Sequence, residues 1–257
     1  MNNSFIRKFY DNNFYGGSEK SYAIEQLKQT TRLETIKRLI SRESKTLVIG
    51  CGAGKDLSLL KEQTVGIDLS LSALLIAKEN GCSKPLIVAD ACNLPFKYDY
   101  FECIICSEVL EHIPESEKAV SEASRVLSKG GTMIVTVPNW YSSWGLIRNF
   151  AEFLTRKPVT AADQPIDNWF TPHRLYKLLS PSFKINTIRG IWYLPPHGKG
   201  NNRIPDVLVY PIYKLLAKSV DRWLGESLPF AGHMIAVKGK NRYSSNAISL
   251  NNTQIQG

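Results

Sequence analysis

The stretch LVIGCGAGKD, at residues 47–56, joins three apolar residues that favour a β-strand to the glycines Gly50, Gly52 and Gly54. A strand followed by such a turn commonly opens a helix, and the first backbone N–H groups of a helix have no partner within it. Because glycine has no Cβ, a ligand can approach this backbone closely. The stretch therefore predicts a strand, a loop and a helix, with a nucleotide-like ligand held at the loop.

Two phosphate-binding fingerprints fit this loop poorly. A P-loop requires a hydroxyl residue where Asp56 stands, and the carboxylate there would repel a phosphate. A dinucleotide fingerprint requires its third glycine where Lys55 stands. A nicotinamide-dependent dehydrogenase is therefore a disfavoured alternative.

Short apolar runs alternate with helical segments along the rest of the chain. The runs lie at residues 46–50, 64–69, 85–90, 101–107, 132–139, 183–194 and 232–240. Continuous apolar strands that alternate with helices indicate a parallel sheet covered on both faces. We therefore predict an α/β fold with a doubly wound, seven-stranded, mostly parallel sheet. In this prediction the last run is a hairpin partner at the end of the sheet.

The chain of 257 residues is long enough for one substantial core, and it shows no internal repeat. We predict a single domain at residues 21–240 that begins with an amphipathic helix at residues 22–40. Residues 1–20 are expected to form a flexible segment, and the Asn- and Ser-rich residues 241–257 a disordered tail. No stretch has the pattern of a signal peptide or a membrane span, so we expect a cytoplasmic protein.

The formal net charge of +9 favours anionic partners such as nucleic acid, an anionic membrane surface or an acidic metabolite. The lysines and arginines are scattered without a long basic run. This distribution predicts a generally cationic surface and no dedicated nucleic-acid tract.

The cysteines are five in number, and most lie inside apolar runs, where a thiol behaves as a small buried hydrophobe. This usage indicates a reducing compartment. Cys103 and Cys106 lie three positions apart on a predicted strand, so their side chains are expected on opposite faces of the sheet. They therefore cannot share a metal or form a redox pair.

Two segments interrupt the alternation of strands and helices. Residues 140–170 are rich in aromatic side chains and follow the fifth strand, so they are predicted to form a lid over the edge where open α/β sheets bind ligands. Residues 207–224 predict a basic amphipathic helix. Its apolar positions are Leu208, Ile212, Leu215, Val220 and Trp223. The helix packs on the core in the simplest interpretation, and contact with a membrane surface or a lipid substrate is the functional alternative.

Two acidic residues end neighbouring strands of the predicted sheet. Asp68 ends the second strand, from which a carboxylate can accept hydrogen bonds from both ribose hydroxyls of an adenosine ligand. Asp90 ends the third strand and suits an adenine amino group, with Ala91 and Leu94 near the ring. A second acid at this edge also disfavours a pyrophosphate there.

The motifs LVIGCGAGKDLSLL, VGIDLS, VADACNLPF, CSEVLEHI and VLSKGGTMIVTVPN occur in this order along the chain. As a set they resemble the successive motifs of class I S-adenosylmethionine-dependent methyltransferases of the methyltransferase type 11 group. The resemblance covers about residues 20–240. It implies the Rossmann-like methyltransferase fold, S-adenosylmethionine as cofactor and methyl transfer as the activity.

The resemblance also implies which residues bind the cofactor. The loop residues that would surround the methionine part are Gly50, Cys51, Gly52 and Gly54. Asp68 would hold the ribose, and Leu69 would lie on one side of the adenine. Asp90 and Ala91 would lie on its other side, and Ser107 at the methionine end.

Methyl transfer from a sulfonium depends mainly on alignment and desolvation, and a base is needed only if the acceptor loses a proton. Histidine is the natural candidate for such a base. His112, just beyond the fourth strand, is the first candidate, and His173, after the aromatic segment, is the second. His197 and His233 are weaker candidates. For His112 and His173 a structural role at the start of a helix is the alternative.

Glu108, Glu111 and His112 form the pattern E-x-x-E-H, which on a helix places all three side chains on one face. The spacing also suits metal ligands, and some methyltransferases that act on quinone precursors or RNA ends resemble this pattern and bind a divalent ion there. No fourth ligand is identifiable in the sequence, so we predict no metal.

Aromatic residues gather in the segments expected to cover the acceptor. They are Trp140, Tyr141, Trp144, Trp169, Phe170, Trp192 and Tyr193. With the interleaved Arg148, Arg156 and Lys157 they could stack single-stranded bases, or they could form the walls of an apolar pocket. Since no repeated basic stripe accompanies them, we predict a small hydrophobic acceptor of quinone, lipid or glycan-lipid type. An RNA or protein methyltransferase and a non-catalytic cofactor-binding partner subunit are the alternatives.

Overall fold

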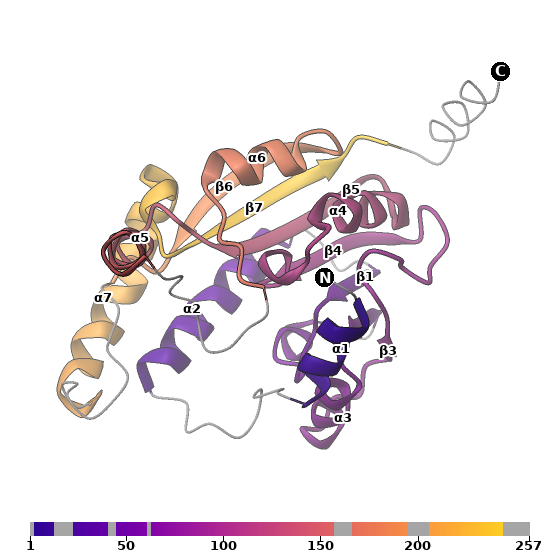
Figure 1. The fold of residues 1–257 in the computed structure, drawn as a ribbon, viewed down its shortest axis with the longest axis horizontal. Helices are drawn as coiled ribbons and strands as arrows, with labels where there is room; N and C mark the ends of the chain where they lie inside the picture. The colour runs from indigo at the N-terminus through magenta and orange to yellow at the C-terminus, as the bar shows by residue number, and fades with distance from the viewer. Residues whose placement is uncertain are drawn as a thin grey trace.

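Seven strands form one sheet in the order β3-β2-β1-β4-β5-β7-β6 in the computed structural model (Figure 1). The structure describes residues 3–12, 23–40, 45–60, 63–156, 166–194 and 206–243. The strands are β1 (Thr46–Ile49), β2 (Thr64–Asp68), β3 (Leu86–Val88), β4 (Phe101–Ser107), β5 (Leu127–Pro138), β6 (Phe183–Ile191) and β7 (Met234–Asn241). The first five pair in parallel, and β7 is antiparallel to both of its neighbours. The predicted seven-stranded, mostly parallel sheet is therefore confirmed.

The last strand does not lie at the end of the sheet, so this part of the prediction is wrong. β7 pairs with β5 on one side, where Val237 faces Val135, and with β6 on the other, where it faces Ile188. The first four residues of β7, Met234 to Val237, are all buried, as expected for a strand with a neighbour on each side. β6 is the edge strand instead, and several of its residues are half exposed.

Helices cover both faces of the sheet (Figure 1). One face packs against α4 (Ser116–Val126) and α6 (Pro172–Leu179). The other face packs against α2 (Ala23–Leu39), α3 (Leu71–Glu79) and α7 (Asp206–Ser227). Short 3-10 helices lie at η1 (Asp56–Leu59), η2 (Leu110–His112) and η3 (Pro229–Ala231). This layered arrangement confirms the doubly wound fold.

Strand β4 shows why a continuous apolar run forms the middle of this sheet. Ile104 and Cys106 pack in the hydrophobic cluster on one face, whereas Cys103 and Ile105 pack in the cluster on the other. Successive side chains of a strand point to opposite faces, so both faces of a central strand must be apolar. The predicted separation of Cys103 from Cys106 is confirmed.

Residues 3–12 form a helix, which contradicts the flexible segment predicted for residues 1–20 in this part; the rest of that segment lies outside the described residues. Helix α1 (Asn3–Asn12) packs against α3, and the side chain of Ile6 is buried. The Ser72 hydroxyl donates to the carbonyl oxygen of Asp11 at 2.9 Å, which fixes the end of α1 on the start of α3. The spacing of Ile6, Phe9 and Tyr10 on one helical face is the signal that predicts this helix.

The described part of the predicted lid contains helix α5 (Ser143–Thr155), which begins shortly after β5. The Ser142 side chain caps this helix by accepting from the N–H of Gly145 at 3.0 Å. The predicted disordered tail beyond residue 243 lies outside the described residues. Of the helices that the structure describes, none is both long and apolar enough to span a bilayer.

Candidate functional site

A cavity of about 280 Å³ opens at the carboxyl ends of β1, β2, β3 and β4. Strand order reverses here, because β1 lies between β2 and β4, and open α/β sheets bind their ligands at such a point. The cavity is lined by Ile6, Tyr10, Ile49, Gly50, Gly52, Ile67, Asp68, Leu69, Ala89, Asp90, Ala91, Glu108, Val109, His112 and Ile113. Its volume lies near the lower end, roughly 300 Å³, of the range for small-molecule sites.

The structure brings most of the predicted cofactor residues to this cavity. Those on its wall are Gly50, Gly52, Asp68, Leu69, Asp90 and Ala91. Cys51 instead points into the core beneath the loop, where it lies against Gly66 and is buried. Gly54 packs against Ala77 of α3. Cys51 and Gly54 therefore pack the loop against the protein interior and do not line the cavity.

Gly50 adopts a left-handed backbone conformation, with φ of 67°. A Cβ at this position would overlap the Val109 side chain, which follows β4 and lines the same cavity. The sequence predicts that a ligand requires the missing side chain, but the close neighbour in the structure is Val109. Glycine is required here both for the backbone conformation and for this contact.

Asp68 joins the glycine loop to the end of β2. Its Oδ2 accepts from the N–H of Gly52 at 2.8 Å, and its Oδ1 accepts from the N–H of Ser70 at 2.9 Å. Burial raises the pKa of this carboxyl, while the N–H bonds from Ser70 and Gly52 oppose that rise. Each carboxylate oxygen has a second lone pair, so Asp68 can accept further hydrogen bonds from a ligand in the cavity.

Asp90 holds the turn after β3 in the same manner. Its Oδ1 accepts from the N–H of Cys92 at 2.8 Å, and the residue lines the cavity next to Ala91. Leu94, expected near an adenine ring, lies in the core instead and does not line the cavity. Leu69 and Ala91 therefore supply apolar walls beside two carboxylates.

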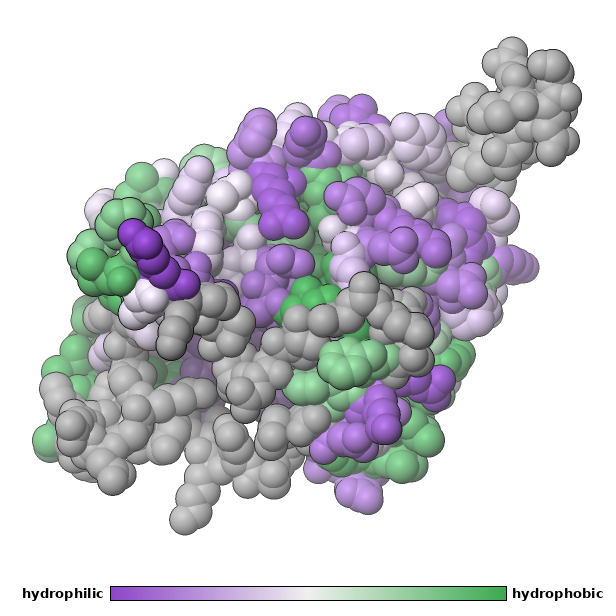
Figure 2. All heavy atoms as spheres, viewed as in Figure 1, coloured by the Kyte–Doolittle hydropathy of each residue, from purple (hydrophilic) through white to green (hydrophobic). Residues whose placement is uncertain are grey.

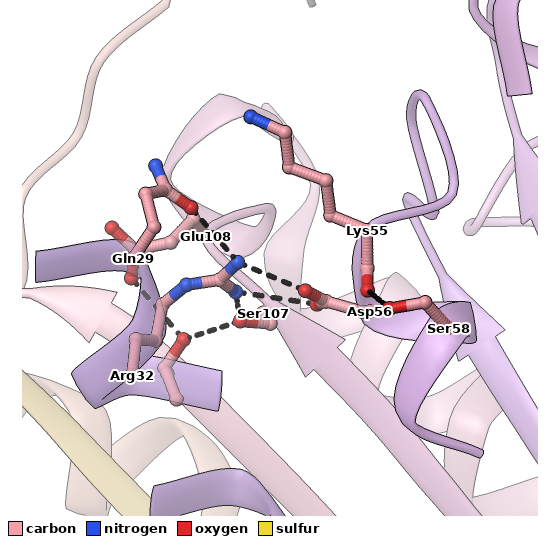
Figure 3. A network of polar contacts seen from close by, with 8 residues as sticks. Gln29, Arg32, Lys55, Asp56, Ser58, Ser107 and Glu108 are labelled. Carbon is pink, nitrogen blue, oxygen red and sulfur yellow. Dashed lines mark hydrogen bonds and ion pairs between the residues drawn. The ribbon is translucent and has the colours of Figure 1, made fainter. Parts of the chain in front are cut away.

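Ser107 belongs to a buried polar network behind the cavity (Figure 3). Arg32 of α2 lies at its centre, and its guanidinium contacts Asp56 at 2.9 Å and 3.2 Å. Arg32 also donates to the Ser107 hydroxyl, and Ser107 lies 2.7 Å from the Thr136 hydroxyl. Thr136 in turn donates to Glu108 at 3.2 Å. Because each hydroxyl has one proton, the chain of donors runs from Arg32 to the cavity wall.

Arg32 is a site residue that the sequence motifs do not reveal. Its position in helix α2 reads as an ordinary solvent-facing cation, yet the residue is only 7% exposed. The sequence signal for its partner is Asp56, an acid where phosphate-binding loops have a hydroxyl residue. The network also explains why Ser107, predicted at the methionine end of the cofactor, is bonded within the protein and does not line the cavity.

Glu108, Glu111 and His112 do not share one helical face as predicted. Glu108 has a left-handed backbone with φ of 57°, and the residues that follow form the short η2 helix. Glu111 is 1% exposed, and its Oε2 has no hydrogen-bond partner among the residues that the structure describes. Burial and the neighbouring Glu108 raise the pKa of Glu111 well above its usual range. Within the described residues, no group of three His, Cys, Asp or Glu side chains is arranged to hold a metal ion.

His112 lines the cavity with a defined tautomer. Its Nδ1 lies 2.8 Å from the carbonyl oxygen of Ile166. A carbonyl can only accept, so Nδ1 carries the proton and Nε2 has the lone pair. Nε2 is 3.8 Å from Oε1 of Glu111. Burial lowers the pKa of His112, so the imidazole is neutral near neutral pH.

The other histidines lie away from this cavity or outside the described residues. His173 is the second residue of α6, after Pro172, and it is exposed without lining the cavity. The alternative of a structural position at a helix start therefore fits His173 better than a base. His233 packs edge-on against Trp169 at 5.7 Å, and burial lowers its pKa to about 3. His197 lies outside the described residues.

Tyr10 of α1 covers the cavity from a segment that was expected to be flexible. Its ring centre lies 6.3 Å from that of His112, and its hydroxyl is buried without a partner. Burial raises the pKa of Tyr10, and the charge of Glu111 adds to this rise. A buried hydroxyl that lacks a partner is available to a polar group of a ligand.

The aromatic segment after β5 lies beside η2. Trp140 and Trp169 pack edge to face at 5.8 Å, and the guanidinium of Arg148 lies about 5 Å from each ring. Arg148 is buried and forms an ion pair with Asp167 at 2.8 Å. The N–H of Asn168 donates to the carbonyl oxygen of Glu111 at 2.9 Å. These bonds hold the aromatic residues next to the His112 side of the cavity.

We expect the substitution Gly50→Ala to abolish binding of adenosylhomocysteine, the demethylated form of the implied cofactor, because the new Cβ displaces Val109 from the cavity wall. Calorimetric titration measures this loss. Gly130→Ala is the matched control, since Gly130 also has a positive φ but open space around a Cβ. Both variants carry a backbone cost of about 1–3 kcal/mol. Equal weakening of binding by both would contradict the role given to Val109.

Replacing Arg32 with methionine should lower the free energy of unfolding by about 3–5 kcal/mol, because Asp56 is left as a buried charge without its partner. Arg38→Met is the control, because the Arg38–Glu34 pair is half exposed and contributes only about 0–1 kcal/mol. Urea unfolding of the three proteins gives both differences. A similar small effect of both substitutions would show that the buried network is not important for stability.

Several known proteins of similar sequence are named as methyltransferases. A family model described as a methyltransferase domain matches residues 47–135. A ubiquinone biosynthesis O-methyltransferase of Bartonella bacilliformis is 30% identical over 183 residues, which is 68% of this chain and 72% of that protein. A tRNA (carboxymethyluridine(34)-5-O)-methyltransferase of Arabidopsis thaliana is 26% identical over 172 residues, 65% of this chain and 40% of that protein. The chain covers only 56%, 20% and 40% of the full length of three of the curated relatives that it matches.

Solved structures show the same fold. A SAM-dependent methyltransferase of Thermotoga maritima superimposes with a TM-score of 0.65 at 18% identity, over 93% of this chain and 99% of that chain. A complex of a methyltransferase activator and a methyltransferase of Haloferax volcanii gives a TM-score of 0.59 at 14% identity, over 93% and 98%. These similarities establish the architecture of the sheet and its helices.

Proposed function

Because the chain belongs to the class I S-adenosylmethionine-dependent methyltransferases, we propose that it methylates a small hydrophobic acceptor of quinone, lipid or glycan-lipid type at a hydroxyl group. The observation that carries the proposal is the position of His112, a neutral imidazole with its Nε2 lone pair in the wall of the cofactor cavity. A hydroxyl acceptor requires a base, whereas a neutral amine acceptor does not.

The residues of the cavity fit S-adenosylmethionine, the cofactor of this family. Asp68 and Asp90 offer carboxylate oxygens at neighbouring strand ends, and Leu69 and Ala91 offer apolar contacts. The close approach of the Gly50 backbone to Val109 keeps the loop side of the cavity narrow. When bound, the cofactor supplies an electrophilic methyl group on a positively charged sulfur. Glu108 adds a further carboxyl group to the cavity wall, and its oxygens would face the positively charged cofactor.

His112 would receive the proton of the acceptor hydroxyl at Nε2. The hydrogen bond from Nδ1–H to Ile166 holds the ring in the tautomer that leaves Nε2 free to accept. Oε1 of Glu111 lies 3.8 Å from Nε2, so the partial negative charge of this oxygen would face the positive charge that the ring then acquires. Trp140 and Trp169, held beside this region by Arg148, supply apolar surface for the acceptor and exclude water.

An RNA acceptor is the second candidate, because some similar proteins are named as tRNA methyltransferases and the net charge is +9. One of the arginines that interleave with the aromatic residues, Arg148, argues against this candidate. Arg148 is buried and its guanidinium is bonded to Asp167 and Glu152, so it does not offer a charge to phosphate. We therefore favour the small hydrophobic acceptor.

Incubation with methyl-labelled S-adenosylmethionine and a fractionated cell extract tests the acceptor class. We expect label in the organic-solvent fraction, in a product whose methyl group is attached to oxygen. Label in the RNA fraction, with activity that falls steeply as salt rises, would support the second candidate instead.

The variant His112→Gln tests the base in the same assay. We expect a loss of about 100-fold to 10,000-fold in methyl transfer, with unchanged affinity for adenosylhomocysteine. Burial lowers the pKa of His112 below about 6.5, the ordinary pKa of histidine, so the imidazole stays neutral as the pH falls to that value. Wild-type activity should therefore decline only at a lower pH. Unchanged activity of His112→Gln would remove His112 from the mechanism.

A further inference from the structure

Helices α5 and α7 expose large apolar side chains on the surface of the molecule. Phe153 is 79% exposed, Leu215 73% and Trp223 75%. Phe150, Leu154 and Ile212 on the same two helices are also more than half exposed. We call these six residues the α5–α7 face. Figure 2 shows hydrophobic atoms along the left side of the molecule, where Figure 1 places α5 and α7.

We propose that the α5–α7 face docks onto an anionic lipid surface. Monomeric soluble proteins rarely expose so many large apolar side chains together, and those that do use them to bind a partner or a membrane. The inference goes beyond the proposed methyl transfer, because it requires neither a lipid acceptor nor a particular base.

Contacts on the buried side of α7 hold the helix in the orientation that exposes its apolar side chains. Ala217 and Asp221 are buried against the sheet. Both carboxylate oxygens of Asp221 accept from the N–H of Trp192, at 3.1 Å and 3.0 Å, and Arg189 donates to the Asp221 carbonyl at 3.1 Å. The helix therefore cannot rotate to bury Leu215 and Trp223. The simplest interpretation of the sequence, in which the apolar positions of this helix pack on the core, is therefore wrong for most of these positions.

Helix α5 is fixed in a similar manner, and it adjoins the end of α7. The buried guanidinium of Arg148 holds its inner side to Asp167. The Asn139 side-chain amide, just before α5, donates to the carbonyl oxygens of Phe230 and Gly232 at 2.8 Å each. Phe230 and Gly232 lie three and five residues beyond Ser227, the last residue of α7, so these bonds anchor the start of α5 to the segment that follows α7. The apolar side chains of both helices therefore project from parts of the surface that are held in fixed positions.

Charges around the face suit anionic headgroups. Arg156 directly follows α5, and Lys214 and Arg222 lie on α7. All three are exposed, and no ion pair involves them among the described residues. The acids beside them are neutralised, since Glu152 pairs with Arg148 and Glu226 with Arg189. An apolar stripe with a cationic border is the pattern of helices that lie in the interface of an anionic membrane.

The same border disfavours a second copy of the chain as the occupant. A symmetric dimer joins identical patches, so it would bring the exposed cations of both copies together around the apolar contact. Like charges at such a rim oppose association. Anionic lipid headgroups meet the same cations with the opposite charge.

Sedimentation with vesicles tests the proposal directly. We expect the wild-type protein to sediment with vesicles of phosphatidylcholine and phosphatidylglycerol, and much less with phosphatidylcholine alone. The double variants Phe150→Ser/Phe153→Ser and Leu215→Ser/Trp223→Ser should each lose about tenfold or more of the binding. Lys214→Glu/Arg222→Glu should lose the preference for the anionic vesicles.

The control is Leu75→Ser/Tyr176→Ser, which removes two large side chains that are 54% and 51% exposed on α3 and α6. This variant should sediment like the wild type, and calorimetry with adenosylhomocysteine should show that every variant is folded. The proposal is overturned if the wild type stays in the supernatant, or if the control variant loses as much binding as the others. A dimer in light scattering that only the face variants dissociate, without vesicle binding, would assign the face to a second copy.

Discussion

The hydrogen bonds from Gly52 and Ser70 to the carboxylate of Asp68 are the constraint on which the site depends. They connect three parts of the chain: the glycine loop after β1, the end of β2 and the start of α3. Because these parts meet where the strand order reverses, the same carboxylate lies on the wall of the cavity. One side chain thus both shapes the loop and presents acceptor oxygens to a ligand.

A second set of buried polar groups supports the opposite wall. The donors that run from Arg32 through Ser107 and Thr136 end at Glu108, which lines the cavity. Burying a charged pair such as Arg32 and Asp56 is costly, and removing only one partner costs more because the other charge is left buried alone, so the pair must stay together in one geometry. On another part of the wall, the buried hydroxyl of Tyr10 has no partner among the described residues and is available to a bound molecule.

Sequence patterns predict the parts of this molecule that depend on local periodicity. The seven apolar runs, the glycine loop and the acids at the ends of β2 and β3 follow from residues that are near one another in the chain. The position of β7 between β5 and β6, the burial of Arg32 and the contact of Val109 with Gly50 depend on residues that are distant in sequence. Local patterns hold no information on such pairs. Tyr10 is different, because its spacing from Ile6 fits a helix and can be seen in the sequence. The many polar residues around these two positions make this helical pattern weak.

We propose that Asp68 holds the ribose of the cofactor, and binding of adenosylhomocysteine to Asp68→Ala tests this proposal most directly. A hydrogen bond to a charged group contributes about 1.5–3 kcal/mol, and the variant also frees the Gly52 loop. Calorimetry should therefore show at least about a tenfold to hundredfold loss of affinity, with the β-sheet core still folded by circular dichroism. Unchanged affinity in a folded variant would contradict the account.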